Sequence, residues 1–219
     1  MKELTGILDL HVHSAPDVMK RSIDDVALAA RIAGSPQQDG YVIKSHYFCT
    51  AERAELVSGL YDGCRVYGGL VLNQSVGGLN KNAVELAARA GARIVWFPTC
   101  DAFHEKASVE NPAISPAKKA AWARIRLAIQ EKTDVPYLRI LEEDGSFAPG
   151  VTEVLDAIAR NGLTLATGHI SPMESMALVR EARARGVQKI LVTHATFPST
   201  FFTIEQQREL VGLGAIIEH

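Results

Sequence analysis

A repeated alternation of short apolar runs and helix-like stretches is the strongest constraint on this fold. The runs end 33, 27, 26, 70, 25 and 25 residues apart, so all but one gap is close to the length of one βα unit. Strands that alternate with helices predict a parallel sheet with helical crossovers. The expected strands are residues 8–13, 41–46, 65–73, 93–98, 163–168, 189–193 and 215–217.

The 70-residue gap between the fourth and fifth expected strands interrupts this rhythm. Residues 99–116 contain Asp101, His104 and Glu105, and their polarity favours a solvated loop over a lid on a site. A helix is expected at about 116–131. Farther on, Asp144-Gly145 lies between apolar runs, a pattern typical of a β-hairpin. We therefore expect a β-hairpin insertion before the fifth strand.

Histidine recurs where the expected strands end. Five of the seven ends carry one. In parallel β/α folds the carboxyl ends of the strands face the same side, and ligands bind there. His11 and His13 are two residues apart on the first strand, so their side chains share a face with Asp9. Together with His169 and His194, this pair predicts a shared metal site.

The motifs Asp9-Leu10-His11-Val12-His13, Thr167-Gly168-His169 and Val192-Thr193-His194 resemble those of the amidohydrolase superfamily of metal-dependent hydrolases. The segments DLHVHSAPD, KSHY and GHIS…VTH are similar to an uncharacterised bacterial branch of it. This resemblance covers essentially the whole chain and implies a TIM-type (β/α)8 barrel. It also implies a divalent metal, zinc, at one or two ions per chain. Its metal ligands would be His11, His13, His169 and His194.

Two features depart from the superfamily pattern. The fourth expected strand, residues 94–99, offers no Lys or Glu ligand, and no eighth strand with its Asp is present. A barrel of this type has about 250 residues, whereas the chain has 219. We therefore expect a single metal-dependent hydrolase barrel domain, residues 1–219, truncated at the C-terminus by the eighth βα unit. A seven-stranded phosphoesterase barrel of the polymerase-and-histidinol-phosphatase type is the alternative, because it also begins with a His-x-His strand.

Three further residues are candidates near the mouth of the barrel. Lys44 and His46 alternate on the second strand, so both side chains can face the site. Lys44 could be a carbamylated bridging ligand or a cation that binds a substrate carboxylate, and His46 a ligand or a supporting donor. Asn73 ends the third strand and could line the pocket. The catalytic residues expected are Lys44 and His194.

The composition of the chain limits the classes of molecule that it is expected to bind. The net charge is −2 and no basic block occurs, which argues against nucleic acid or a charged membrane surface. No apolar run approaches the ~20 residues of a membrane helix. Three cysteines without CxxC spacing indicate reduced thiols, and with no signal peptide a cytoplasmic location is expected. Unpaired edge strands predict a homo-oligomer.

The expected function is hydrolysis of a small-molecule amide, lactone or ester by metal-activated water. A non-catalytic metal- or ligand-binding barrel is a second hypothesis, favoured by the missing strand 8 Asp. The substrate is not encoded in these motifs, because specificity resides in the loops that follow the strands.

Overall fold

Seven parallel strands form one sheet whose spatial order follows the sequence from β1 to β7. The structure is a computed structural model and describes residues 4–219. The strands are β1 (Ile7–Val12), β2 (Gln38–Ile43), β3 (Arg65–Val71), β4 (Ile94–Trp96), β5 (Thr164–Ala166), β6 (Lys189–Val192) and β7 (Ile216–Ile217). The predicted alternation of strands and helices in an α/β fold is confirmed.

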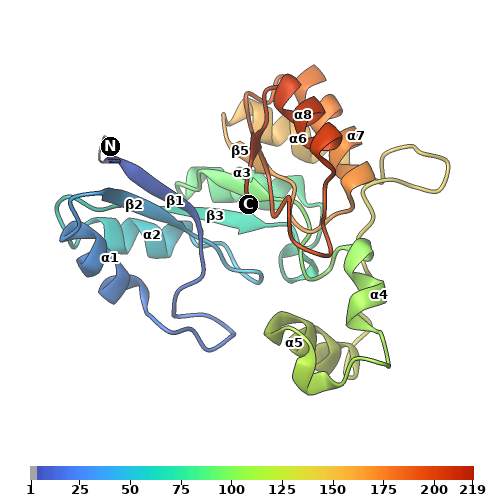
Figure 1. Cartoon of the computed structure of the whole chain (residues 1–219), viewed down its shortest axis with the longest axis horizontal. Helices are drawn as coiled ribbons and strands as arrows, with labels where there is room; N and C mark the ends of the chain where they lie inside the picture. The colour runs from blue at the N-terminus through green and yellow to red at the C-terminus, as the bar shows by residue number, and fades with distance from the viewer. Residues whose placement is uncertain (1–3) are drawn as a thin grey trace.

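The sheet curls into an open half-barrel, so the predicted (β/α)8 barrel is wrong (Figure 1). Strands β1 and β7 are the two edges and do not pair with each other in the described part of the chain. A closed barrel needs a consistent number, tilt and stagger of strands. Here β4 and β5 have three residues and β7 has two, so they contribute few ladder hydrogen bonds toward closure.

Helices cover the convex face of the sheet, and the core lies between the two. Val95 and Leu165 point outward into this core, which the helices complete with Leu155 and Val179. Ile94 and Trp96 point to the concave face, as the two-residue period of a strand requires. The helices of the repeating units are α1 (Asp25–Ala33), α2 (Ala51–Ser58), α3 (Lys81–Arg89), α6 (Val151–Arg160), α7 (Pro172–Ala184) and α8 (Ile204–Gly212), with a short 3₁₀ turn η1 (Gln74–Val76).

The segment between β4 and β5 contains the helix expected at about 116–131, but no two-stranded hairpin forms around Asp144-Gly145. The helical elements of the segment are η2 (Phe103–Glu105), α4 (Lys106–Val109), η3 (Pro116–Lys118) and α5 (Ala121–Gln130). Of the hairpin, a single antiparallel bridge between Leu141 and Phe147 remains. The turn forms because Ser146 N and Oγ donate to Asp144 Oδ1 (2.9 and 2.6 Å). Its flanks do not continue as strands, since Ile140 N donates to Glu174 on α7.

Helices α4 and α5 stand apart from the sheet on the side of its carboxyl ends (Figure 1). The buried Arg126 of α5 ties this segment to the sheet, because its Nη1 donates to Asp101 Oδ1 at 2.5 Å. Asp101 and Glu105 are 6% and 2% exposed, so the expected solvated loop is instead packed against the domain. None of the described helices has the length and apolar character needed to cross a membrane.

Candidate metal centre and its cavity

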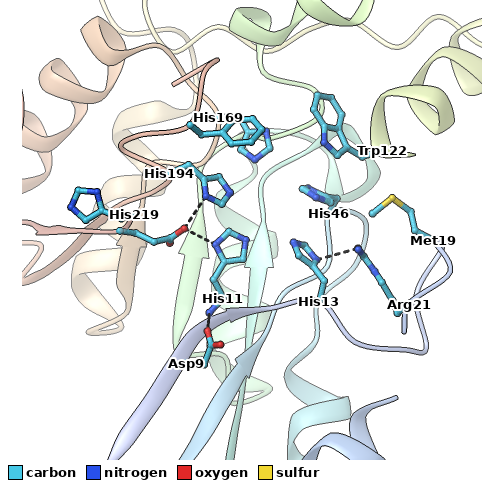
Figure 2. Close-up of a pocket in the computed structure, with 12 residues that line it drawn as sticks. Asp9, His11, His13, Met19, Arg21, His46, Trp122, His169, His194 and His219 are labelled. Atoms are coloured by element: carbon cyan, nitrogen blue, oxygen red, sulfur yellow. Dashed lines mark hydrogen bonds and ion pairs between the residues drawn. The ribbon is translucent and has the colours of Figure 1, made fainter. Parts of the chain in front are cut away.

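A cavity of about 470 Å3 opens at the carboxyl ends of the strands. Six of the seven histidines of the chain line this cavity, and the seventh, His104, lies elsewhere (Figure 2). The remaining wall consists of two acidic residues, one arginine and three apolar side chains: Asp9, Glu218, Arg21, Met19, Trp122 and Phe197. The cavity therefore lies at the carboxyl ends of the strands, where the sequence predicted that the histidines would gather.

His11, His194 and Glu218 form the tightest group of potential metal ligands. One ligand atom from each lies within 4.8 Å of the other two. Glu218 Oε1 is 2.9 Å from His11 Nδ1 and 3.0 Å from His194 Nδ1 (Figure 2). The imidazole rings of the two histidines are 4.7 Å apart. Two imidazoles and one carboxylate thus converge at one point on the cavity wall.

Local backbone structure explains how Glu218 reaches this point. It follows β7, and its N–H donates to Val192 O while its carbonyl accepts from Ala195 N (2.9 and 2.8 Å). These bonds place it directly beside His194. The φ of His194 is 52°, the only positive φ of a non-glycine residue in the described chain. Such a conformation costs energy and is concentrated at functional sites.

A bulge in β1 turns His11 toward the cavity. The pairing of β1 with β2 shifts register between Asp9 and Val12. As a result Leu10 packs on the concave face, whereas Val12 packs with the cluster under α1 and α2. The carboxylate of Asp9 accepts from His11 N at 3.0 Å and supports this irregular turn. Asp9 therefore stabilises the backbone beside His11 and lies at the edge of the cavity.

The electrostatic surroundings favour a neutral His11 and an ionised Glu218. Burial, and then the charge of Lys44, lower the pKa of His11 to about 4. Burial acts to raise the pKa of Glu218, but hydrogen bonds from His11 and His194 outweigh it and bring that pKa below its usual range. A neutral imidazole and an ionised carboxylate are the forms that bind metals.

Lys44 lies behind His11 and not on the cavity wall. Its side chain is 1% exposed, and its Nζ lies 2.9 Å from His11 Nε2, within hydrogen-bond distance. The amine also lies 5.3 Å from the ring centre of Trp96. Burial lowers the pKa of Lys44 to about 7. The position fits a residue that orients His11 better than one that meets a substrate carboxylate.

His13 and His46 form a second pair beside the first. Their rings stack at 4.9 Å, and the ring of His13 is 5.3 Å from that of His11. His46 Nδ1 lies 2.8 Å from Thr99 Oγ1. Asn73 holds this arrangement together, because its amide donates to Thr99 Oγ1 and to the carbonyl of His46 (2.7 and 2.9 Å). Asn73 is 1% exposed and supports the pocket from behind.

His169 faces a carboxylate that the sequence had placed in a solvated loop. Glu105 Oε1 is 3.2 Å from His169 Nδ1, an ion-pair distance without hydrogen-bond alignment. Within the described residues neither ring nitrogen of His169 makes a hydrogen bond. Ser199 Oγ donates to the same Glu105 oxygen at 3.0 Å and fixes it. Burial lowers the pKa of His169 to about 4, and Glu105 partly opposes this effect.

The four predicted histidine ligands all line the cavity, and two of them, His11 and His194, belong to the group whose ligand atoms lie within 4.8 Å of one another. His11 and His194 share Glu218, while His13 pairs with His46 and His169 pairs with Glu105. Sequence reasoning did not select Glu218, although it follows the seventh expected strand at the same level as the histidines. Arg21 was also not selected, because a loop arginine carries no periodic signal.

Comparison with known proteins identifies the family. Residues 6–218 match DUF6282, a family of unknown function, and the chain belongs to that family. No curated protein matches the sequence. The family carries no assigned activity, so the resemblance to the amidohydrolase superfamily stays a prediction.

Two solved structures are similar in outline. A 2,3-dimethylmalate lyase of the PEP mutase/isocitrate lyase superfamily has 11% identity and a TM-score of 0.45, over 98% of this chain and 67% of that one. Helicobacter pylori aminofutalosine deaminase has 10% identity and a TM-score of 0.48, over 89% of this chain and 47% of that one. Both TM-scores are below 0.5, so the function argued below rests on the residues of this chain.

Proposed function

We propose that the chain is a metal-dependent hydrolase that cleaves an amide, lactone or ester bond of a small molecule. The metal, zinc, would be held by His11, His194 and Glu218. The observation that carries this proposal is the convergence of these three side chains, within 4.8 Å, on the wall of an open cavity. An open site with three protein ligands is the arrangement of catalytic zinc.

The chemistry of the donors fits such a metal. Two imidazoles and a carboxylate match the His₂Glu set of zinc hydrolases. Glu218 Oε2 is buried and has no hydrogen-bond partner within the described residues, so it remains available as a donor. When bound, a divalent metal supplies Lewis acidity, which polarises a scissile carbonyl and makes water a nucleophile near neutral pH.

The proton acceptor in this proposal is His169. Its ring is 5.5 Å from that of His194, and burial keeps it neutral at pH 7. A neutral imidazole can take a proton from a water molecule in the cavity. Glu105, 3.2 Å from Nδ1, would stabilise the imidazolium that results. This pair would perform the proton transfer that the superfamily assigns to an Asp on its eighth strand.

The other predicted residues have supporting roles in this scheme. A neutral Lys44 amine would accept a hydrogen bond from Nε2–H of His11, which fixes the ring and leaves the lone pair of Nδ1 toward the metal. His46 and Asn73 support His13 from behind. In this assignment His194 is a ligand, and Lys44 acts on catalysis only through His11.

Metal analysis of the purified protein tests the proposal. We expect one zinc per chain in the wild type and a sharp loss in His194→Ala and Glu218→Gln, with circular dichroism unchanged. His104→Ala and Glu209→Gln are matched controls, since neither residue lines the cavity, and they should keep full metal content. Unchanged zinc in both His194→Ala and Glu218→Gln would contradict the assigned ligands.

Turnover separates the proposal from its alternatives. Paired assays with p-nitrophenyl acetate and p-nitrophenyl phosphate distinguish a carboxyl-ester hydrolase from a phosphoesterase. We expect zinc-dependent release of p-nitrophenol from the acetate. Full zinc content without turnover of a broad amide, lactone and ester panel would support a binding protein instead.

A further inference from the structure

Arg21 is the one Arg or Lys side chain on the cavity wall among the described residues. Its Nε and Nη2 both reach Asp17 Oδ2, at 2.7 and 2.5 Å. Nη2 also donates to His13 Nδ1 at 3.1 Å. The Asp17 carboxylate is itself held by Val18 N and Ser45 Oγ (2.8 and 3.2 Å), and its side chain is 1% exposed. The guanidinium group is therefore fixed in place.

One nitrogen of this guanidinium group, Nη1, is not used by the described residues. Nη1 makes no hydrogen bond to any described residue, while Arg21 is 15% exposed and faces the cavity (Figure 2). Both N–H groups of Nη2 are used by Asp17 and His13, so the two N–H groups of Nη1 are the donors that remain for an anion. A fixed guanidinium with a free Nη1 in a cavity is thus a recognition element for an anion.

Apolar and aromatic side chains complete the wall. Trp122 comes from α5, and its ring is 5.7 Å from that of His169. Phe197 is 54% exposed at the mouth, with its ring 5.7 Å from that of His194. The buried ion pair of Arg126 with Asp101 anchors α5 and so fixes Trp122. These rings offer flat surfaces on the cavity wall, Phe197 beside His194 and Trp122 beside His169.

The spacing of these groups limits the ligand. The ring of His13 touches Arg21 on one side and lies 5.3 Å from the ring of His11 on the other. The anion site and the proposed metal site are thus separated by one imidazole. The free Nη1 offers donors to a single carboxylate group, and a cavity of about 470 Å3 accommodates a small molecule.

We propose that this cavity selects small monoanionic carboxylates with an apolar or aromatic body, whose carboxylate pairs with Arg21 and whose body lies against Trp122 and Phe197. The inference deepens the proposed function, on which it rests, by naming the substrate class. In such a substrate, the carboxylate bound by Arg21 would lie only a few bonds from the amide, lactone or ester group that reacts.

Calorimetric titration with benzoate and benzamide tests this selection, since the two probes share a ring and differ in charge. We expect the zinc-loaded wild type to bind benzoate about tenfold or more tightly than benzamide. Arg21→Gln should abolish that preference, and Arg21→Lys should keep part of it. Arg180→Gln, on the exposed face of α7, is the matched control and should behave as the wild type. Trp122→Ala should weaken the binding of benzoate and of benzamide by the same factor.

Two controls keep the test decisive. Arg21→Gln leaves the buried Asp17 carboxylate unpaired, so the double variant Asp17→Asn/Arg21→Gln provides a folded alternative with the same expected loss. Equal binding of both probes by the wild type would overturn the inference. So would a benzoate preference that persists without Arg21 and disappears on zinc removal, because the carboxylate would then bind the metal. Zinc content is measured on each sample, so a failure of the metal assignment is seen separately.

Discussion

Replacing Gly168 with alanine tests how the fold positions His169. Gly168 has a φ of +69°, and an added Cβ would collide with the carbonyl oxygen of Phe97 and lie 2.6 Å from that of Pro98. The next residue is held by a bond from His169 N to Pro98 O at 2.9 Å. The substitution must therefore either strain the backbone or push His169 away from β4.

The magnitude follows from two contributions. The left-handed conformation costs alanine about 1–2 kcal/mol, of which ~0.4–1 kcal/mol is recovered from the lower entropy of the unfolded chain. Backbone overlap adds about 1–3 kcal/mol. We expect Gly168→Ala to lower the free energy of unfolding by about 2–4 kcal/mol, or Tm by roughly 4–15 °C for a chain of this size.

Gly162→Ala is the matched control. Gly162 has a φ of +61°, but nothing lies within 4 Å of its added Cβ. It carries the conformational cost alone, so about 0.5–1.5 kcal/mol is expected. Urea denaturation followed by tryptophan fluorescence measures both variants, and zinc content and turnover are compared on the folded samples. We expect Gly168→Ala to keep zinc and lose turnover. Equal destabilisation by the two variants would refute the reasoning.

Four further predictions concern the site and the assembly. Glu105→Gln should reduce kcat while zinc content stays, because the imidazolium of His169 loses its counterion; an unchanged kcat and pH profile would count against the proton-transfer role. Lys44→Met should weaken zinc binding several-fold by releasing His11, whereas a fall from two zinc ions to one would indicate a bridging carbamate. The pKa values of His11 and His169 lie at about 4 in the folded protein, below the unfolded value of about 6.5. The unfolded state therefore binds more protons below pH 6.5, and the metal-free protein should lose on the order of 1 kcal/mol of stability per pH unit per imidazole between pH 6.5 and 4; denaturation midpoints that do not change over this range would be inconsistent with buried neutral rings. The open edges β1 and β7 predict a homo-oligomer, and light scattering that gives the monomer mass at micromolar concentration would argue against it.

The position of the site at the carboxyl ends of the strands could be predicted from the sequence, because it depends only on where each strand ends. Strand-end histidines such as His46, His169 and His194 lie at the carboxyl ends of parallel strands, whether or not the sheet closes. Closure itself depends on strand lengths and stagger. Apolar runs were expected at 93–98 and 163–168, but the paired strands β4 and β5 have only three residues each. The hydrophobic pattern of a sequence does not predict the residue at which backbone hydrogen bonding between two strands ends.

The grouping of the ligands depends on contacts that periodicity does not encode. Glu218 joins His11 because the backbone of β7 continues past Ile217 beside β6. Glu105 reaches His169 because the segment after β4 folds back as η2, where polarity alone favoured a solvated loop. The Asp144-Gly145 turn was recognised from its chemistry, but its flanks pair only around the Leu141–Phe147 bridge, and beyond it Ile140 N bonds to Glu174 of α7. A turn signal predicts the reversal of the chain and not the length of the pairing that follows.

The open sheet and the proposed site are connected by one feature of the geometry. His11 belongs to β1 and Glu218 follows β7, so their 2.9 Å contact joins the two edges that do not pair. At the opposite end of the strands the concave face remains open, as a cavity of about 430 Å3 lined by Leu10, Ile94 and Lys189 among others. Polar groups thus bring the edges together only where the cavity lies. Ligands that converge across both edges do not require an eighth strand between them, so the proposed metal site can be assembled on a half-barrel.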